Sequence, residues 1–249
     1  MMIWRYDGSF EGFLSSVVQS YTDKTLPDLL TKSEVDIGLF DEILDISTNT
    51  KDALKLLHAI EKQLGGKIKE KIYHTFLCDD QPFENDLLRY IRLGFKEPSL
   101  LEMISHPLVY AIEEYQKRTL RTVHKMNAFS RFETLEDGTL YAQISPPRNV
   151  LPLMGGHFKK RFKHERFIIH DLKRSMALIY DGHSLEIHNI HDYDLPQRSF
   201  DEEKYQHLWK RFFDHVAISE RLNPNLQRSH IPLLYREWMC EFQNHILLK

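Results

Sequence analysis

The amino-acid sequence predicts an α+β fold, with a helical N-terminal half followed by an antiparallel sheet of about five strands packed with helices. Apolar residues recur with helical spacing through the first half, and the pattern changes to strand alternation after Asn127. The hydrophobic content of 42% is enough for a folded core. We expect a mainly helical region over 1–105 and an α+β region over 106–249. One continuous domain is the alternative, because no linker composition marks the boundary.

The N-terminal half carries start signals for two strands and several helices. Residues 3–6 form a short strand candidate that ends at the turn pair Asp7-Gly8, and Ser9 is placed to cap the next helix. A second strand is expected at 42–46, inside an otherwise polar and irregular stretch. The expected helices cover residues 9–21, 51–64, 67–77, 83–93 and 99–102.

A long helix is expected to begin at Pro107, because a proline in the first helical turn loses no hydrogen bond. Its apolar stripe leaves Arg118, Arg121 and Lys125 on a different face. These basic side chains are therefore expected to project away from the core.

The sheet is expected after this helix. A hairpin is indicated by alternating residues on both sides of the turn Glu136-Asp137-Gly138. A helix over 154–162 follows a proline-bracketed loop, and a capping box at Ser199–Glu202 begins another helix, before a helical C-terminus. The expected strands cover residues 129–135, 139–144, 167–170, 176–180 and 184–190.

Basic residues are concentrated between Lys117 and Arg174. This stretch has 13 Lys and Arg against five Asp and Glu, a charge of +8, so the other segments carry −11 within the net −3. Phe and His rings interleave with the basic residues, and phosphate-binding groups mixed with flat rings suit nucleic acid. A solvated basic face without a ligand is the alternative. The residues expected to bind nucleic acid are Arg121, His124, Lys125, Arg131, Lys159, Lys160, Arg161, Lys173, Arg174 and Arg228.

The sequence contains no phosphate-binding glycine loop, dinucleotide fingerprint, HExxH helix or nucleophile-elbow serine. This argues against an ordinary ATPase, dehydrogenase, metalloprotease or hydrolase, and it leaves open whether the chain is an enzyme. Candidates for acid and base groups are His124, His157, Asp171 and His230. Each has a structural alternative: hydrogen bonding for the histidines, and a salt-bridged turn for Asp171 with Arg174.

A cluster of histidines near the end of the predicted sheet is a candidate metal site. His183, His188 and His191 lie close together, and strand alternation places Glu186 and His188 on one face. The spacing matches no established metal site, so the sequence predicts neither a metal nor a cofactor.

The composition predicts a cytoplasmic protein. Cys78 and Cys240 form no disulfide framework, and no apolar run is long enough to cross a bilayer. The N-terminal sequence MMIWRYDGSFEG has acidic residues where a signal peptide needs an apolar centre. We therefore expect no membrane interaction.

Several long motifs of the chain resemble those of one bacterial family. They are YDGSFEGFL at 6–14, LRTVHKMNAFSRF at 120–132, HFKKRF at 157–162, IIHDLKRSMALIYDG at 168–182 and ERLNPNLQRSHIPLLY at 220–235. They occur in the right order over nearly the whole chain. Members of this family are described as DNA metabolism or DNA repair proteins and contain a domain of unknown function. The protein is typically encoded beside a radical-SAM protein, and a similar domain occurs fused to a uracil-DNA glycosylase.

The resemblance implies a role in DNA repair or modification with a radical-SAM partner, but it supplies no catalytic residues. The chain lacks the three clustered cysteines of a radical-SAM iron–sulfur site, and we expect no glycosylase portion after LLYREWM. The leading hypothesis is a DNA-binding accessory protein. The alternatives are a stand-alone enzyme acting on nucleic acid or nucleotide, and a protein-interaction module with a basic face.

Overall fold

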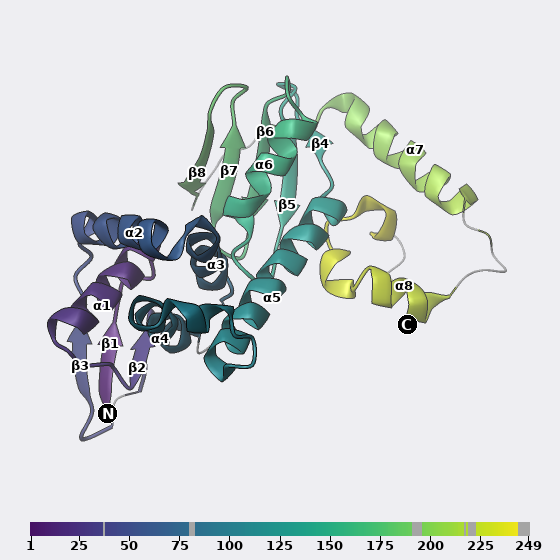
Figure 1. Ribbon diagram of the computed structural model, residues 1–249. Helices are drawn as coiled ribbons and strands as arrows, with labels where there is room; N and C mark the ends of the chain where they lie inside the picture. Colours follow the sequence, from purple (N-terminus) through teal and green to yellow (C-terminus); the bar gives the residue numbers. More distant parts are fainter. Residues whose placement is uncertain (37, 80–82, 191–195, 217, 219–222, 244–249) are drawn as a thin grey trace. The chain divides into compact units, whose positions relative to one another are not determined.

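The structure, a computed structural model, describes residues 1–249 except 37, 80–82, 191–195, 217, 219–222 and 244–249. The chain divides into unit 1 (Met1–Leu120) and unit 2 (Arg121–Lys249) (Figure 1). The division falls inside the long helix α5 (Pro107–Phe129), which confirms the helix predicted from Pro107. The predicted boundary between residues 105 and 106 lies just before this helix and stays a prediction.

Unit 1 contains a three-stranded parallel sheet with the N-terminal strand at its centre. β1 (Met2–Arg5) pairs on one side with β2 (Leu29–Thr31) and on the other with β3 (Glu42–Asp45). β1 and β3 confirm the strands predicted near the N-terminus. β2 was not predicted, because three residues are too few to show strand alternation.

The helices of unit 1 follow the predicted apolar stripes. They are α1 (Phe10–Thr22), α2 (Thr50–Leu64), α3 (Gly66–Phe76), α4 (Phe83–Lys96) and the 3-10 helix η1 (Pro98–Glu102). Ser9 caps α1 as predicted, since its Oγ accepts a hydrogen bond from the Gly12 N–H at 2.9 Å. Trp4, Phe13 and Tyr90 are fully buried in one hydrophobic core built from strands and helices of this unit.

Unit 2 is built on a five-stranded sheet in the order β4-β5-β6-β7-β8. The strands are β4 (Glu133–Thr134), β5 (Leu140–Ile144), β6 (Phe167–Asp171), β7 (Met176–Tyr180) and β8 (Leu185–Asn189). The α+β class, the five strands and the hairpin between β4 and β5 are confirmed. One pair differs from the prediction: β5 and β6 are parallel, so the sheet is mixed rather than antiparallel.

The parallel pair has a simple cause in the connection between its strands. The chain between β5 and β6 contains the helix α6 (Leu151–Arg161), which carries it back so that β6 runs in the same direction as β5. A second correction concerns β4, which is shorter than the predicted strand 129–135. Helix α5 continues through Phe129, and this leaves only Glu133 and Thr134 in the strand.

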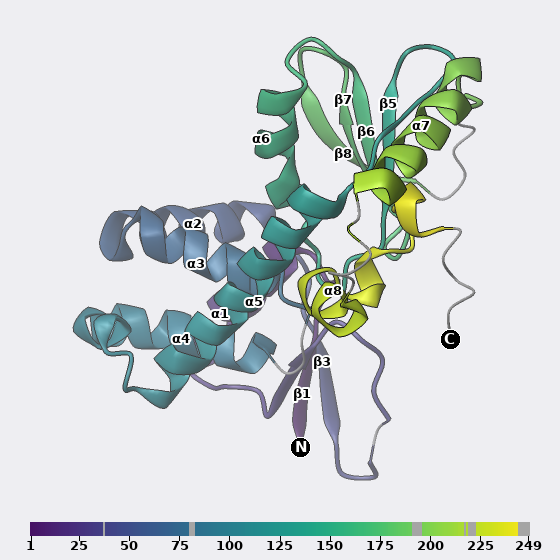
Figure 2. The same ribbon diagram turned by 90° about the vertical axis from the view of Figure 1, so that its right-hand side faces the viewer.

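Helix α6 packs against one face of the sheet. Its Met154 and Phe158 are fully buried with Phe167 and other side chains of that face. Gly155 allows the close approach, because a Cβ at this position would lie 2.3 Å from Leu185 Cδ2. A smaller apolar cluster that includes Tyr141 lies on the opposite face. In Figure 2, α6 is to the left of the strands and α7 (Phe200–Val216) is to the right.

The C-terminal part of unit 2 is helical, as predicted. Helix α7 begins after Ser199, where it was predicted, but the capping box is not formed: the Ser199 N–H donates to the Thr134 carbonyl oxygen, and Glu202 accepts from the Thr134 N–H. Helix α7 is followed by α8 (Pro224–His230) and the 3-10 helices η3 (Leu233–Tyr235) and η4 (Cys240–Phe242). Among the described residues, no helix is long and apolar enough to cross a membrane.

Candidate nucleic-acid interface

Unit 2 contains a cavity of about 620 Å³ beside the β4–β5 edge of its sheet. β4 pairs only with Leu140 and Tyr141, so within the described residues the remainder of this edge of β5 has no strand beside it. The ends of α5 and α6, helix α7 and the C-terminal segment supply the other walls. The cavity therefore gathers residues that are more than 100 positions apart in the sequence.

The first arginine of the cavity, Arg131, is held by a buried carboxylate. Its Nη2 lies 2.7 Å from Oε1 of Glu241, whose side chain is only 2% exposed. Burial opposes ionisation of Glu241, but hydrogen bonds from Arg131, its own backbone and Trp209 outweigh it, and the pKa of Glu241 is lowered. The ion pair thus fixes both the arginine and the C-terminal segment in the cavity wall.

A second arginine, Arg198, is paired with Glu133 at 2.6 Å between Nε and Oε2. Burial raises the pKa of Glu133, although Arg198 partly offsets this effect. The neighbouring Glu202 is also buried; it accepts a hydrogen bond from the Thr134 N–H at 2.9 Å and another from Gln206 at 3.0 Å. These contacts attach the start of α7 to β4.

The third arginine, Arg161, differs from the other two. It lies at the end of α6, its guanidinium is 5.4 Å from the centroid of the Phe162 ring, and no acidic side chain among the described residues pairs with it. Phe162 in turn contacts Phe132 with ring centroids 4.9 Å apart. The cavity thus has a cation without an acidic partner directly beside aromatic rings.

The rest of the aromatic wall comes from α7 and the C-terminal segment. Tyr205, Trp209 and Trp238 line the cavity, and Tyr205 is 64% exposed. The buried Nε1–H of Trp238 has no hydrogen-bond acceptor among the described residues. The sequence did not predict these rings or Arg198 as site residues, because they lie outside the basic stretch Lys117–Arg174.

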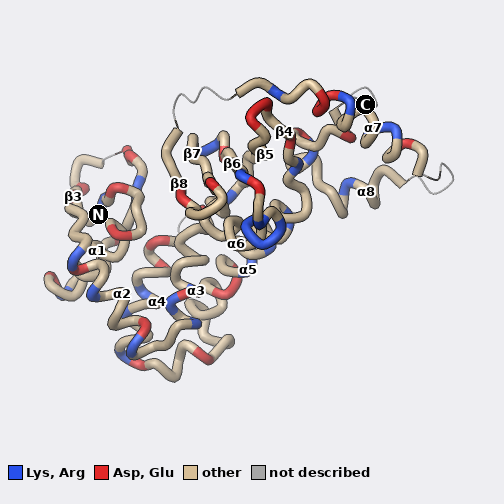
Figure 3. Tube along the Cα trace, turned by 90° about the horizontal axis from the view of Figure 1, so that it is seen from above, with Lys and Arg blue, Asp and Glu red and all other residues tan. Residues whose placement is uncertain are grey.

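The three predicted basic residues of α6 lie in different surroundings. Lys159, Lys160 and Arg161 form the basic last turn of this helix, visible as a blue group at α6 in Figure 3. Lys159 Nζ lies 5.2 Å from the centroid of the Tyr180 ring and 3.4 Å from the carbonyl oxygen of His183. Lys160 is exposed, and of the three only Arg161 lines the cavity.

Other predicted residues lie outside the cavity lining. Arg121 and His124 are exposed on α5, and Lys125 Nζ lies 5.4 Å from the centroid of the Tyr235 ring. Arg228 is exposed on α8. Among the acid and base candidates, His157 is exposed on α6 and His230 on α8, and neither lines the cavity.

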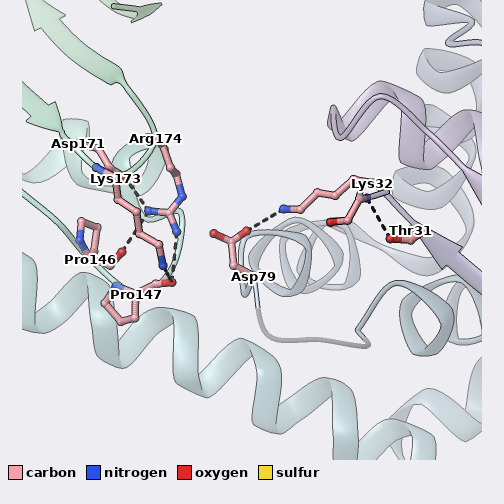
Figure 4. A network of polar contacts seen from close by, with 9 residues as sticks. Thr31, Lys32, Asp79, Pro146, Pro147, Asp171, Lys173 and Arg174 are labelled. Atoms are coloured by element: carbon pink, nitrogen blue, oxygen red, sulfur yellow. Dashed lines mark hydrogen bonds and ion pairs between the residues drawn. The ribbon is translucent and has the colours of Figure 1, made fainter. Parts of the chain in front are cut away.

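Asp171, Lys173 and Arg174 form a structural network at the end of β6 (Figure 4). The Asp171 side chain is fully buried; it pairs with Nη1 of Arg174 at 2.9 Å and accepts the Lys173 N–H at 3.1 Å. The Arg174 guanidinium also donates to the carbonyl oxygens of Pro146 and Pro147, and Lys173 Nζ donates to that of Pro147. This is the salt-bridged turn that the sequence offered as the alternative to a catalytic Asp171.

The histidine cluster is only partly within the described residues, because His191 lies outside them. His188 and Glu186 do share a face, with Nε2 and Oε2 3.2 Å apart. Among the described residues, no group of three or more His, Cys, Asp or Glu side chains is arranged to hold a metal ion.

The fold and the cavity define an α+β protein with a cavity lined by arginines, glutamates and aromatic rings at the edge of a mixed sheet. The chain belongs to the family of the domain of unknown function DUF4130, whose model matches residues 81–241. The matched range contains all the arginines and rings of the cavity described above. No curated protein is significantly similar to the chain.

Proposed function

We propose that this chain is a nucleic-acid-binding protein of a DNA repair or modification system, and that the cavity of unit 2 holds the nucleic acid. The supporting observation is that Arg161, which has no acidic partner among the described residues, lines one cavity with several aromatic rings and with the ion-paired Arg131 and Arg198. Guanidinium groups bind phosphate, and aromatic rings stack on bases. A volume of about 620 Å³ lies within the usual range of ligand pockets.

In this proposal the chain is an accessory protein, and a radical-SAM partner performs the chemistry on the DNA. The support is the resemblance of the motifs to a family encoded beside such a protein. The division of roles agrees with the cysteine content, since two cysteines are too few for the iron–sulfur ligands of a radical-SAM enzyme. The cavity would then hold the DNA while the partner acts on it.

The binding is tested by fluorescence anisotropy with labelled single-stranded and duplex DNA over a series of salt concentrations. Affinity should fall steeply with salt, because each phosphate that is neutralised releases condensed counterions. Arg161→Ala should weaken binding and reduce the salt slope by about one phosphate contact. Arg89→Ala removes the same charge from an exposed position of unit 1 and should change neither quantity.

Two results would contradict this proposal. Absence of binding to either DNA at low salt would remove the function itself. Equal losses in Arg161→Ala and Arg89→Ala would place the binding outside the cavity. The partner is tested separately by copurification of the tagged chain with a radical-SAM protein of the kind encoded beside members of the resembling family, and a failure to copurify with DNA present would leave only the DNA-binding part.

A further inference from the structure

One polar group in the cavity wall is held in a fixed orientation by a chain of hydrogen bonds. Gln143 and Tyr141 are two residues apart on β5, so both point to the same side of the sheet and line the cavity. The Gln143 Nε2–H donates to Tyr141 Oη at 3.2 Å. Tyr141 Oη lies 2.9 Å from Nδ1 of His170, on the neighbouring strand β6. His170 is the register partner of Gln143, so the sheet itself sets this geometry.

The protonation state of His170 supports this direction of hydrogen bonding. Burial lowers the pKa of His170, with Asp171 opposing, so the imidazole is neutral at pH 7. Tyr141 Oη accepts from Gln143, and its own O–H can donate to Nδ1 of His170 in the neutral tautomer that carries the proton on Nε2. The carboxamide of Gln143 is left with its carbonyl oxygen and one N–H unused, because no described donor reaches that oxygen.

A carboxamide offers a hydrogen-bond acceptor next to a donor, and such a pair can recognise the edge of a nucleobase. On the Watson–Crick edge, adenine and cytosine present a donor beside an acceptor, guanine presents the two in the opposite order, and thymine and uracil present a donor between two acceptors and so offer both orders. A carboxamide that rotates freely pairs with either order. A carboxamide that is held by Tyr141 and His170 pairs with only one order of donor and acceptor.

The surroundings of Gln143 suit a single unpaired nucleotide. Among the described residues Arg161 has no acidic partner and is placed to bind a phosphate, and the aromatic rings of Tyr205, Trp209 and Trp238 line the same cavity, where a base can stack. In a duplex the Watson–Crick edge of a base is already paired, so such a cavity reads that edge only in a single-stranded or extruded nucleotide.

We infer that the cavity binds one unpaired nucleobase, and that Gln143, oriented by Tyr141 and His170, distinguishes adenine and cytosine from guanine. This inference rests on the proposed function and adds its substrate class and its specificity-determining residue. Gln143 contacts the base, whereas Tyr141 and His170 are positioning residues.

The test uses the full chain and labelled single strands of abasic residues that each carry one adenine, cytosine or guanine, and measures binding by anisotropy at low salt. Wild type should prefer one class over the other by roughly five- to 150-fold, the range of a good bidentate contact. Gln143→Ala should remove the preference. Tyr141→Phe should reduce it by strengthening the weaker class, because the released carboxamide can rotate; a purely structural role would weaken all strands alike. Arg161→Ala should weaken all strands by the same factor and keep the preference.

The outcomes separate this inference from the function on which it rests. Binding without any preference in wild type, or a preference that persists in Gln143→Ala, would overturn the inference and leave nucleic-acid binding in place. No binding to any strand would overturn both. Thermal unfolding of each variant checks that the fold is retained, and if Tyr141→Phe does not fold, the Gln143→Ala comparison still decides.

Discussion

The two units of the chain differ in how they use charge. Unit 1 has 14 Lys and Arg against 20 Asp and Glu, a net charge of −6, whereas unit 2 has 19 against 16, a net charge of +3. The core of unit 1 is one apolar cluster, while the apolar residues of unit 2 are divided between the two faces of its sheet. The basic unit also contains the arginine-lined cavity, so the net charge and the candidate site coincide.

Ion pairs of the two units also differ in how far their carboxylates are buried. In unit 1, the Arg5–Asp45 and Lys32–Asp79 pairs involve side chains of which at least one is more than a third exposed. In unit 2, the carboxylates of Asp171 and Glu241 are almost fully buried against arginines. Exposed pairs add little stability, but a buried charge that loses its partner is costly. Substitution of charged residues should therefore cost most where a carboxylate is buried against an arginine, as at Asp171 and Glu241.

The largest expected effect follows from this contrast. Arg174→Met leaves the buried Asp171 carboxylate without its partner and should lower the free energy of unfolding by about 3–5 kcal/mol. Lys32→Met removes an exposed partner of Asp79 in unit 1 and should cost about 0–1 kcal/mol. Urea denaturation of both variants measures the difference (Figure 4 shows both pairs). Equal losses would show that burial of the carboxylate does not distinguish the units.

The next effect concerns binding rather than stability. Replacing Lys159, Lys160 and Arg161 together with Ala should lower DNA affinity tenfold or more at low salt and should flatten the salt slope, about equally for all sequences. The matched control replaces the exposed Lys51, Lys62 and Lys67 of unit 1, which removes the same charge. If the control loses as much affinity, the net charge of the whole chain matters and the end of α6 does not.

Two helical glycines provide a comparison of packing. Gly155→Ala would place a Cβ 2.3 Å from Leu185 Cδ2, and overpacking of this kind costs about 1–3 kcal/mol. In unit 1, Gly94→Ala meets Leu101 Cδ1 and Leu64 Cδ1 at 2.9 Å, a much smaller overlap that the gain of about 1 kcal/mol from alanine in a helix can offset. We expect Gly155→Ala to be destabilising and Gly94→Ala to be close to neutral in thermal unfolding. The reverse order would mean that α6 packs less tightly on its sheet than α4 packs on its neighbours.

The smallest effect is a shared dependence on pH. Burial lowers the pKa of His74 in unit 1 and of His170 in unit 2 below the ordinary value of about 6.5. The unfolded chain therefore takes up these protons first as the pH falls. Stability from the neutral imidazoles is fully present above a pH of about 6.5 and is lost as the pH falls through the lowered folded values.

NMR titration of the two imidazoles gives these pKa values directly, and urea midpoints between about pH 5 and 8 give their effect on stability. His74→Gln and His170→Gln should each flatten the pH dependence. A titration at or above the ordinary value for either histidine would contradict the corresponding part of this prediction.

Much of the secondary structure was predictable because it depends on local patterns. The stripe spacing located α1 to α5 closely, Ser9 marked the start of α1, and the Asp137-Gly138 turn located the β4–β5 hairpin. The concentration of basic residues at the end of α6 is likewise a property of the sequence alone. These features depend on neighbours within a few residues, which a single sequence displays directly.

Only the tertiary structure decided which side chains meet. It paired β5 with β6 in parallel, turned Lys173 and Arg174 toward the carbonyls of Pro146 and Pro147, and brought Arg198 to the same cavity as Arg131. It also aligned Gln143 with His170 across two strands. Such contacts join residues far apart in the chain, and their direction depends on strand order and on helix packing. The local spacing of residues does not indicate strand order or helix packing. The basic residues could therefore be counted from the sequence, but their partners could not be assigned.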